Sequence, residues 1–407
     1  MKSDIERLMQ ENKVDALFIT GPGRFNPAMN YMAGGIGVSH ADLFVLPGRE
    51  PILFHSPIER EGAAESGFEL HSQAGIPLKP MLEETGGDSK LAHALRYREM
   101  FRSVGLTRGT VALYGDVDLG NAYRLIATLQ KHLPDLKFAS GSDQDVLRKA
   151  RATKDETEIA HIRAVGEKTL RVVDEIADFL TSHAVRDEVM VKSDGEPLTI
   201  GDVKKRLRIL LAEQDLRETG TIFAIGENAT VPHNEGNPTD VLRLGQTIVF
   251  DAFFQEANGG YWHDFTRTWC LGYAPDREQH LFDQVKTVIE RVEKAVEAGK
   301  PFGQYQQLTQ DMFEEMGHPT LRTDPSTERG YVHGLGHGVG LEVHETPFAG
   351  ANTSDNILQP GMVITIEPGL YYPEWGCAIR IEDTFVITAE GKAAPLVDYP
   401  RDLVLPV

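Results

Sequence analysis

Apolar residues in the first part of the chain follow the spacing of short helices and strands. Near the N-terminus, Ile5, Leu8 and Met9 fall on one helical face, and Ser3 with Glu6 has the spacing of a capping box. We expect strands to follow over residues 14–20, 42–46, 51–54 and 110–114, with helical stretches among them. This alternation predicts an α/β domain over residues 1–150, in which no motif indicates chemistry of its own.

A second set of elements begins near residue 150. Thr153 and Glu156 repeat the capping-box spacing and predict the start of a helix. The inward face of this helix would carry Ile159, Ile162, Val165, Val173, Ile176 and Leu180. A later helix would carry Leu281, Val285, Val288, Val292 and Val296, and would stop at Gly299 before Pro301.

Two Gly-led segments rich in β-forming residues, 245–251 and 361–367, each end on a carboxylate. Together with the two helices they predict a mixed α/β second domain over residues 151–407, built with long antiparallel-type strands. The fold class expected for the whole chain is therefore α/β (α+β), with two domains.

Composition and charge exclude several classes of protein. Of the 407 residues, 41% are hydrophobic and 25% are charged, as in an ordinary folded enzyme. The net charge of −20 would repel phosphate backbones and anionic lipid, so we expect no nucleic-acid and no membrane partner. No apolar run exceeds four residues and the N-terminus is unlike a secretion signal, so we expect a cytoplasmic protein. Cys270 and Cys377 are expected to be buried, reduced thiols in strands.

Four acidic residues and one histidine have unusual sequence surroundings. They are Asp251, Asp264, His337, Glu367 and Glu382. Four carboxylates can balance two divalent cations, whereas without a cation most of the clustered acids would be protonated. Ligation by oxygen with one nitrogen favours Mn(II), Co(II) or Zn(II) over copper or a structural zinc.

Each of these positions also has an ordinary structural interpretation. A single acid at a strand end is usually a surface or capping residue. The glycines around His333 and His337 can simply mark a loop with positive backbone angles. The combination is more specific than its members, because Glu382 follows Arg380 by two residues and Asp264 precedes Thr266 by two, which places each pair on one strand face.

The order of these residues and their surrounding motifs resembles one superfamily. The motifs are Asp-Phe-Thr-Arg-Thr, His-Gly-Leu-Gly-His-Gly-Val-Gly-Leu, Ile-Glu-Pro-Gly and Arg-Ile-Glu-Asp. They are similar to those of the methionine aminopeptidase, prolidase and aminopeptidase P superfamily, and the similarity extends over residues 153–407. The resemblance implies a "pita-bread" catalytic domain there, preceded by a domain that resembles the creatinase-type N-terminal domain in size, position and order of elements.

The resemblance also implies roles for the metal-ligating residues. Asp251 would chelate one ion, Asp264 and Glu382 would bridge two ions, and His337 with Glu367 would complete the second site. Glu367 would also act as the proton shuttle, because a carboxylate held at a metal can take a proton from water and pass it to the leaving nitrogen.

Three further histidines fit the proline-directed branch of the superfamily. They are His233, His333 and His344, which by this resemblance line the substrate site and assist catalysis. Each could instead be a capping or surface histidine. Because the amide before proline has no N–H, such a site must enclose the ring and hold the neighbouring carbonyls.

The activity implied is hydrolysis of the Xaa-Pro bond in dipeptides, with two divalent ions, first of all Mn(II). Residues 345–366 contain no Lys or Arg, although prolidases place a basic residue there for the dipeptide carboxylate. Arg380, Arg24 or a second subunit of a homodimer could hold that carboxylate instead.

Three alternatives stay open at this point. The chain could be an Xaa-Pro aminopeptidase acting on longer peptides, or a non-peptide amidase of the same superfamily. It could also be a metal-free creatinase-like hydrolase or a binding relative, although such proteins usually lose metal ligands and all five are present here.

Overall fold

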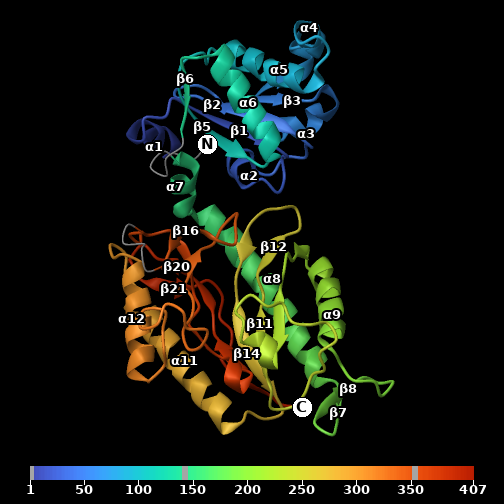
Figure 1. Ribbon diagram of the computed structural model, residues 1–407, viewed down its shortest axis with the longest axis vertical. Coiled ribbons are helices and arrows are strands. Elements are labelled where there is room, and N and C mark those ends of the chain that lie inside the picture. The colour runs from blue at the N-terminus through green and yellow to red at the C-terminus, as the bar shows by residue number, and fades with distance from the viewer. Residues whose placement is uncertain (1–3, 140–144, 351–355) are drawn as a thin grey trace. The chain divides into compact units, whose positions relative to one another are not determined.

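The chain divides into two units. A computed structural model describes residues 4–139, 145–350 and 356–407. Unit 1 comprises Met1–Arg151 with Asn258–Gly260, and unit 2 comprises Ala152–Ala257 with Tyr261–Val407 (Figure 1). Within the described ranges, every helix is too short or too polar to cross a lipid bilayer.

Unit 1 is a six-stranded sheet with helices packed on it. Its elements are α1 (Ile5–Glu11), β1 (Ala16–Gly21), α2 (Pro27–Ala33), β2 (Ala41–Val45), β3 (Ile52–His55), η1 (Pro57–Glu59), α3 (Arg60–Ala64), β4 (Glu69–Ser72), η2 (Gln73–Gly75), α4 (Leu78–Glu84), α5 (Ser89–Ser103), β5 (Gly109–Gly115), α6 (Leu119–His132), β6 (Leu136–Phe138) and α7 (Val146–Ala152).

The strands of unit 1 are ordered β4-β3-β2-β1-β5-β6. β1 runs parallel to β5 and antiparallel to β2. The core lies between this sheet and helix α5, where Phe18, Phe44 and Phe101 are buried and their ring centroids are 4.9 to 5.2 Å apart. These aromatic contacts and the apolar area they bury stabilise the unit.

Unit 2 contains two main sheets and four long helices. Its elements are α8 (Glu156–Thr181), β7 (Ala184–Arg186), β8 (Val189–Val191), α9 (Ile200–Glu213), β9 (Leu216–Arg217), β10 (Ile222–Ile225), α10 (Gly226–Ala229), β11 (Thr247–Asp251), β12 (Phe254–Glu256), β13 (Trp262–His263), β14 (Thr266–Leu271), α11 (Asp276–Ala295), α12 (Gly303–Glu315), β15 (His337–Gly338), β16 (Glu345–Phe348), β17 (Val363–Ile366), β18 (Gly369–Tyr372), η4 (Pro373–Trp375), β19 (Cys377–Arg380), β20 (Asp383–Ile387), β21 (Ala393–Pro395) and β22 (Val404–Leu405).

The strands of unit 2 lie between two pairs of helices. Helices α8 and α9 pack with the sheet ordered β10-β11-β14-β22, and α11 and α12 pack with the strands of the sheet ordered β16-β15-β17-β20-β21 (Figure 1). An antiparallel bridge between Thr266 and Glu382 connects the two sheets. This bridge brings the segment that contains Asp264 beside the segment that contains Glu382.

The buried helix faces agree with the predictions, but several boundaries do not. Helix α8 is capped by Asp155 and Glu158, not by Thr153 and Glu156, because the Asp155 carboxylate accepts hydrogen bonds from two backbone N–H groups while Thr153 forms a bridge with Met362. Helix α11 ends at Ala295 rather than at Gly299, since the next residues are already extended.

Smaller corrections concern the N-terminus and the strands. Ser3 lies outside the described residues, and Asp4 occupies the N-cap position of α1. The strands of unit 2 are shorter than expected, because the longest described one, β14, has six residues. Both cysteines are free and buried in strands, as predicted, with Cys270 in β14 and Cys377 in β19.

Candidate metal centre

The candidate residues of unit 2 come from the ends of short strands. Asp251 is the last residue of β11, Asp264 lies between β13 and β14, and His337 begins β15. Glu367 follows β17, and Glu382 lies between β19 and β20. A strand end places the side chain at the rim of a sheet with a fixed backbone, which suits a rigid ligand site.

These residues line a single cavity of about 550 Å³. Its lining includes nine of the residues selected from the sequence, namely Asp251, Asp264, His337, Glu367, Glu382, His233, His333, His344 and Arg380. Arg24, also considered for the substrate carboxylate, is not among the described lining residues and donates instead to Gly35 O within unit 1. The separation along the chain between the first and last of the nine exceeds a hundred residues, so the tertiary fold brings them together.

Three of the residues are arranged as a group that can hold a metal ion. One ligand atom from each of Asp264, His337 and Glu382 lies within 4.8 Å of the others, and all three residues are buried. His337 Nε2 is 3.6 Å from Asp264 Oδ2 and 3.4 Å from Glu367 Oε1. The His337 Nδ1–H faces its neighbour's carbonyl oxygen, Gly338 O, at 3.1 Å, which leaves the Nε2 lone pair directed to the acids.

Among the described residues, each buried carboxylate of the cluster keeps one oxygen without a hydrogen-bond partner. These oxygens are Asp251 Oδ1, Asp264 Oδ1 and Glu382 Oε1. In two of these carboxylates the second oxygen accepts a hydrogen bond. Thr266 donates to Glu382 Oε2 at 2.7 Å, and Arg380 donates to Asp251 Oδ2 at 2.5 Å. Buried acceptors without donors are rare and costly, so these three oxygens fit a divalent cation, which accepts oxygen ligands.

The pKa shifts within the cluster also favour a bound cation. Burial raises the pKa of Asp264 well above its usual range, and the Asp251 and Glu367 carboxylates raise it further. Burial and the Asp264 carboxylate likewise raise the pKa of Glu382, and burial raises that of Glu367 to about 8. Burial lowers the pKa of His337 to about 3, so the imidazole is neutral and can act as a ligand. A bound cation would remove the repulsion among the acids.

The three histidines lie in different settings along the same cavity. The ring of His344 is 4.3 Å from that of His337, centroid to centroid, and His233 is exposed. His333 Nδ1–H donates to Gly334 O at 2.7 Å, and its Nε2 is 3.0 Å from the hydroxyl of Tyr371. Burial lowers the pKa of His333 to about 3, so Nε2 accepts the hydrogen bond from Tyr371.

Arg380 is held inside the cluster. Its guanidinium donates to Asp251 Oδ2, to the Tyr371 hydroxyl at 2.8 Å and to the Pro232 carbonyl at 3.2 Å. Among the described lining residues of this cavity, no other Lys or Arg is present. Arg380 is therefore occupied by its neighbours, and the cavity offers a ligand carboxylate no uncommitted arginine or lysine from this set.

Sequence reasoning missed two residues that organise this site. Tyr371 in β18 links Arg380 to His333, and its only signal in the sequence was its place in a strand directly after the Glu-Pro-Gly motif. Thr266 was noted for its strand face, but not as the donor that orients Glu382.

Comparison with known proteins gives a family and a fold. The profile of metallopeptidase family M24 matches residues 160–389. The chain is similar to the Xaa-Pro dipeptidase of Pyrococcus horikoshii, with 28% identity over 405 residues that cover 98% of this chain and 97% of that protein.

Solved structures agree along almost the entire chain. The Xaa-Pro dipeptidase from Bacillus anthracis is 21% identical, with a TM-score of 0.76 and 98% of each chain covered. The X-Pro aminopeptidase from Thermotoga maritima is 23% identical, with a TM-score of 0.73 and 99% of each chain covered. The mixed α/β fold predicted from the sequence is confirmed by these similarities.

Proposed function

This chain belongs to metallopeptidase family M24, and from that membership and its buried carboxylate cluster we propose that it hydrolyses the bond before proline in Xaa-Pro dipeptides. The observation that supports this most directly is the set of three carboxylate oxygens that have no hydrogen-bond partner in the described part of the chain and lie near a neutral histidine. A relative that matches over nearly its full length is named an Xaa-Pro dipeptidase.

We assign the metal ligands as follows. Asp251, Asp264, His337, Glu367 and Glu382 would hold two divalent ions. Mn(II) is the proposed ion, with Co(II) or Zn(II) as alternatives, because the donor set is four carboxylates and one imidazole. When bound, such ions polarise the scissile carbonyl and activate water for attack.

Protein groups then position the substrate and move the proton. Glu367 keeps 18% of its side-chain surface exposed, so its carboxyl can reach a water in the cavity and pass a proton to the leaving proline nitrogen. Thr365 donates to Glu367 Oε1 at 3.5 Å and helps orient it. His233, His333 and His344 line the substrate side, where an Xaa-Pro bond with no N–H must be held through its carbonyls.

Arg380 supports the ligands rather than the substrate. Its ion pair with Asp251 orients that carboxylate, while Tyr371 connects the same guanidinium to His333. Removing Arg380 would leave Asp251 without the donor to Oδ2, which is costly for a buried acid.

A second candidate function has its own supporting observation. A dipeptide carries a carboxylate close to the scissile bond, and the described lining of this cavity has no uncommitted Lys or Arg to pair with it. An Xaa-Pro aminopeptidase, whose longer substrates extend that carboxylate away from the site, would not need such a partner.

The deciding experiment measures both the metal content of the protein and its hydrolysis of defined peptides. Wild type loaded with Mn(II) should contain about two ions per chain, and it should release proline from Ala-Pro but not alanine from Ala-Ala. Asp264→Asn should lose at least one ion and all hydrolysis, while Asp283→Asn on the exposed face of α11 should keep both. Absence of stoichiometric metal in the wild type, or inactivity on every Xaa-Pro peptide, would exclude the proposal.

The same assay separates the two candidates. For a dipeptidase, kcat/KM should be higher for Ala-Pro than for Ala-Pro-Ala, and Ala-Pro amide should be a poor substrate. A clearly higher kcat/KM for the tripeptide would make the aminopeptidase the better assignment. We also propose a cytoplasmic homodimer; light scattering coupled to size exclusion would reject the dimer if it measured one 45.1 kDa chain.

A further inference from the structure

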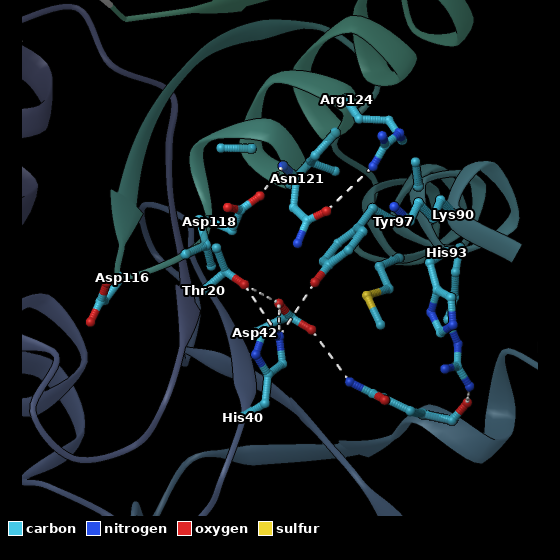
Figure 2. A pocket seen from close by; sticks show the side chains of 17 residues that line it. Thr20, His40, Asp42, Lys90, His93, Tyr97, Asp116, Asp118, Asn121 and Arg124 are labelled. Atoms are coloured by element: carbon cyan, nitrogen blue, oxygen red, sulfur yellow. Dashed lines mark hydrogen bonds and ion pairs between the residues drawn. The ribbon is translucent and has the colours of Figure 1, made fainter.

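The cavities of the two units differ in how their acids are bonded. In unit 1 a cavity of about 690 Å³ lies beside the fully buried Asp42 (Figure 2). Thr20 donates to Asp42 Oδ1 at 2.7 Å and Gln73 donates to Oδ2 at 3.4 Å, so both oxygens are satisfied within the protein. Glu235 in the cavity of unit 2 differs, because its side chain is 60% exposed. Among the described lining residues of that cavity, it is the one carboxylate that is not assigned to the metal centre.

The backbone at Glu235 is held against strand β10. Its carbonyl accepts a hydrogen bond from Phe223 N at 3.4 Å, and the next residue, Gly236, has a φ of +82°. A Cβ at Gly236 would lie 2.2 Å from Phe223 O, so only glycine allows the chain to turn this close to the strand. The turn therefore fixes the point from which the Glu235 side chain extends.

The two carboxylate oxygens of Glu235 have different surroundings. Oε2 is 3.6 Å from Lys204 Nζ of helix α9, an ion pair that is longer than a hydrogen bond. Oε1 lies on the side of Gly220, where a Cβ would be 3.2 Å from this oxygen and 3.8 Å from Phe253 Cζ. Because Gly220 has no side chain, the carboxylate and the edge of the Phe253 ring border the same part of the cavity.

An apolar wall connects this carboxylate to the metal centre. Ile222 is the register partner of Asp251 across β10 and β11, and Phe253 packs against the same buried cluster as Ile222. Gly220 precedes Ile222 by two residues, which is at most about 7 Å along the chain. A ligand side chain that starts near Asp251 and reaches Glu235 would therefore need an apolar stem and a positively charged end.

The direction of a bound dipeptide follows from the two sheets that contribute to the centre. Glu367, the proposed proton donor to the proline nitrogen, follows β17, whereas Asp251 ends β11 in the other sheet. Proline on the Glu367 side leaves the Xaa residue on the side of Asp251 and β10. The Xaa side chain would therefore lie along the wall that leads to Glu235.

We propose that Glu235 selects a basic Xaa residue, so that Lys-Pro and Arg-Pro are preferred among the Xaa-Pro dipeptides. The stem of lysine or arginine would pack on Ile222 and Phe253, while its cation pairs with Glu235 Oε1 and approaches the Phe253 ring. This inference rests on the proposed hydrolysis of Xaa-Pro dipeptides and names their class. The alternative, that Glu235 only neutralises Lys204, predicts no selection by this carboxylate.

The test compares kcat/KM for Lys-Pro with kcat/KM for norleucyl-proline, which has the same four-carbon chain without the ammonium. Glu235→Gln should lower the ratio of the two at least about threefold, within the range measured for exposed ion pairs. The change should lie in KM, because a contact made equally by the bound substrate and the transition state lowers KM without raising kcat. The wild-type ratio should also fall at high salt, which screens an exposed pair.

Two further variants separate this selection from the overall charge of the protein. Glu213→Gln removes the same charge from an exposed position of α9, outside the described lining, and should leave the ratio unchanged. Lys204→Met removes the cation that competes for Glu235, and should raise the ratio.

The outcomes distinguish this inference from the proposed function. Hydrolysis of Ala-Pro together with the same ratio in wild type and Glu235→Gln would overturn the role of Glu235 alone. An equal fall of the ratio in Glu213→Gln would also overturn that role, since the effect would then come from net charge. Inactivity of the Mn(II)-loaded wild type on Ala-Pro, norleucyl-proline and Lys-Pro would overturn both.

Discussion

Replacing Arg267 by methionine should destabilise unit 2, because this arginine joins its two sheets. Arg267 is fully buried in β14, and its guanidinium lies 4.2 Å from the centroid of the Phe265 ring. It donates five hydrogen bonds. The acceptors are the carbonyls of Thr266, Glu382, Tyr399 and Pro400, each at 2.9 Å, and Asp383 Oδ1 at 2.7 Å.

The size of the effect depends on which acceptors keep another donor. The carbonyls of Thr266 and Glu382 still pair with each other's N–H, and Asp383 keeps its contacts with Arg401. The carbonyls of the segment 399–400 lose their donor, and Asp383 loses one charged bond. At about 1 kcal/mol for each of these three bonds, and with the desolvation of the guanidinium relieved, we expect a net loss of about 3 kcal/mol.

The assay can observe unit 2 alone. All three tryptophans, Trp262, Trp269 and Trp375, belong to that unit, so their fluorescence during urea titration reports its unfolding. With an m-value of about 2–3 kcal/mol/M, the midpoint should fall by about 1 M.

A matched control is Arg291→Met on the exposed face of α11, which should leave the midpoint unchanged. Coinciding midpoints for the Arg267 and Arg291 variants would show that the buried guanidinium adds no net stability, and would refute the reasoning.

Four further outcomes are expected. Glu367→Gln should lower kcat by about 10²–10⁴-fold, and near-native kcat at full metal occupancy would contradict its assigned role. Chelation with EDTA should lower the melting temperature, because ions that bind the folded state stabilise it by mass action; an unchanged melting temperature would argue against bound metal. The hydrogen bond with Asp42 raises the pKa of His40, so its stabilisation is present below the usual pKa near 6.5 and is lost as the pH rises through the folded pKa; NMR titration should show that Asp42→Asn lowers this pKa. Burial raises the thiol pKa of Cys270 and Cys377 to about 12, so Ellman's reagent should label neither until urea unfolds the chain.

Much of the candidate site could be predicted from the sequence because its residues lie in short, strongly patterned segments. Glu367 ends an apolar segment and precedes Pro-Gly, and Asp251 ends another, so both were expected at strand ends. Helix faces such as that of α8 were equally readable from their spacing. Boundaries were less accurate, because Asp155 competes with Thr153 for the cap and only the backbone geometry decides between them.

The sequence carried no comparable signal for contacts between segments that are far apart in the chain. Nothing near Tyr371 in the chain shows that its hydroxyl will lie between Arg380 and His333, and the donors of Arg267 reach the segment 399–400 more than a hundred residues away. Such contacts depend on strand register and sheet order, which local periodicity does not encode.

The sequence by itself therefore determined the kinds of element, and it was enough to select the candidate acidic residues and the hard-cation chemistry that such a set would favour. Only the tertiary structure decided that Arg380 is committed to Asp251, and that Asp42 of unit 1 is buried against a cavity. The physical reason is that the type of a helix or strand follows from residues close by in the chain, and the chemistry of a side chain follows from the residue itself. A side chain's partners follow from which strands pair, and here the order β2-β1-β5 places Asp42, Thr20 and Asp116 around one cavity.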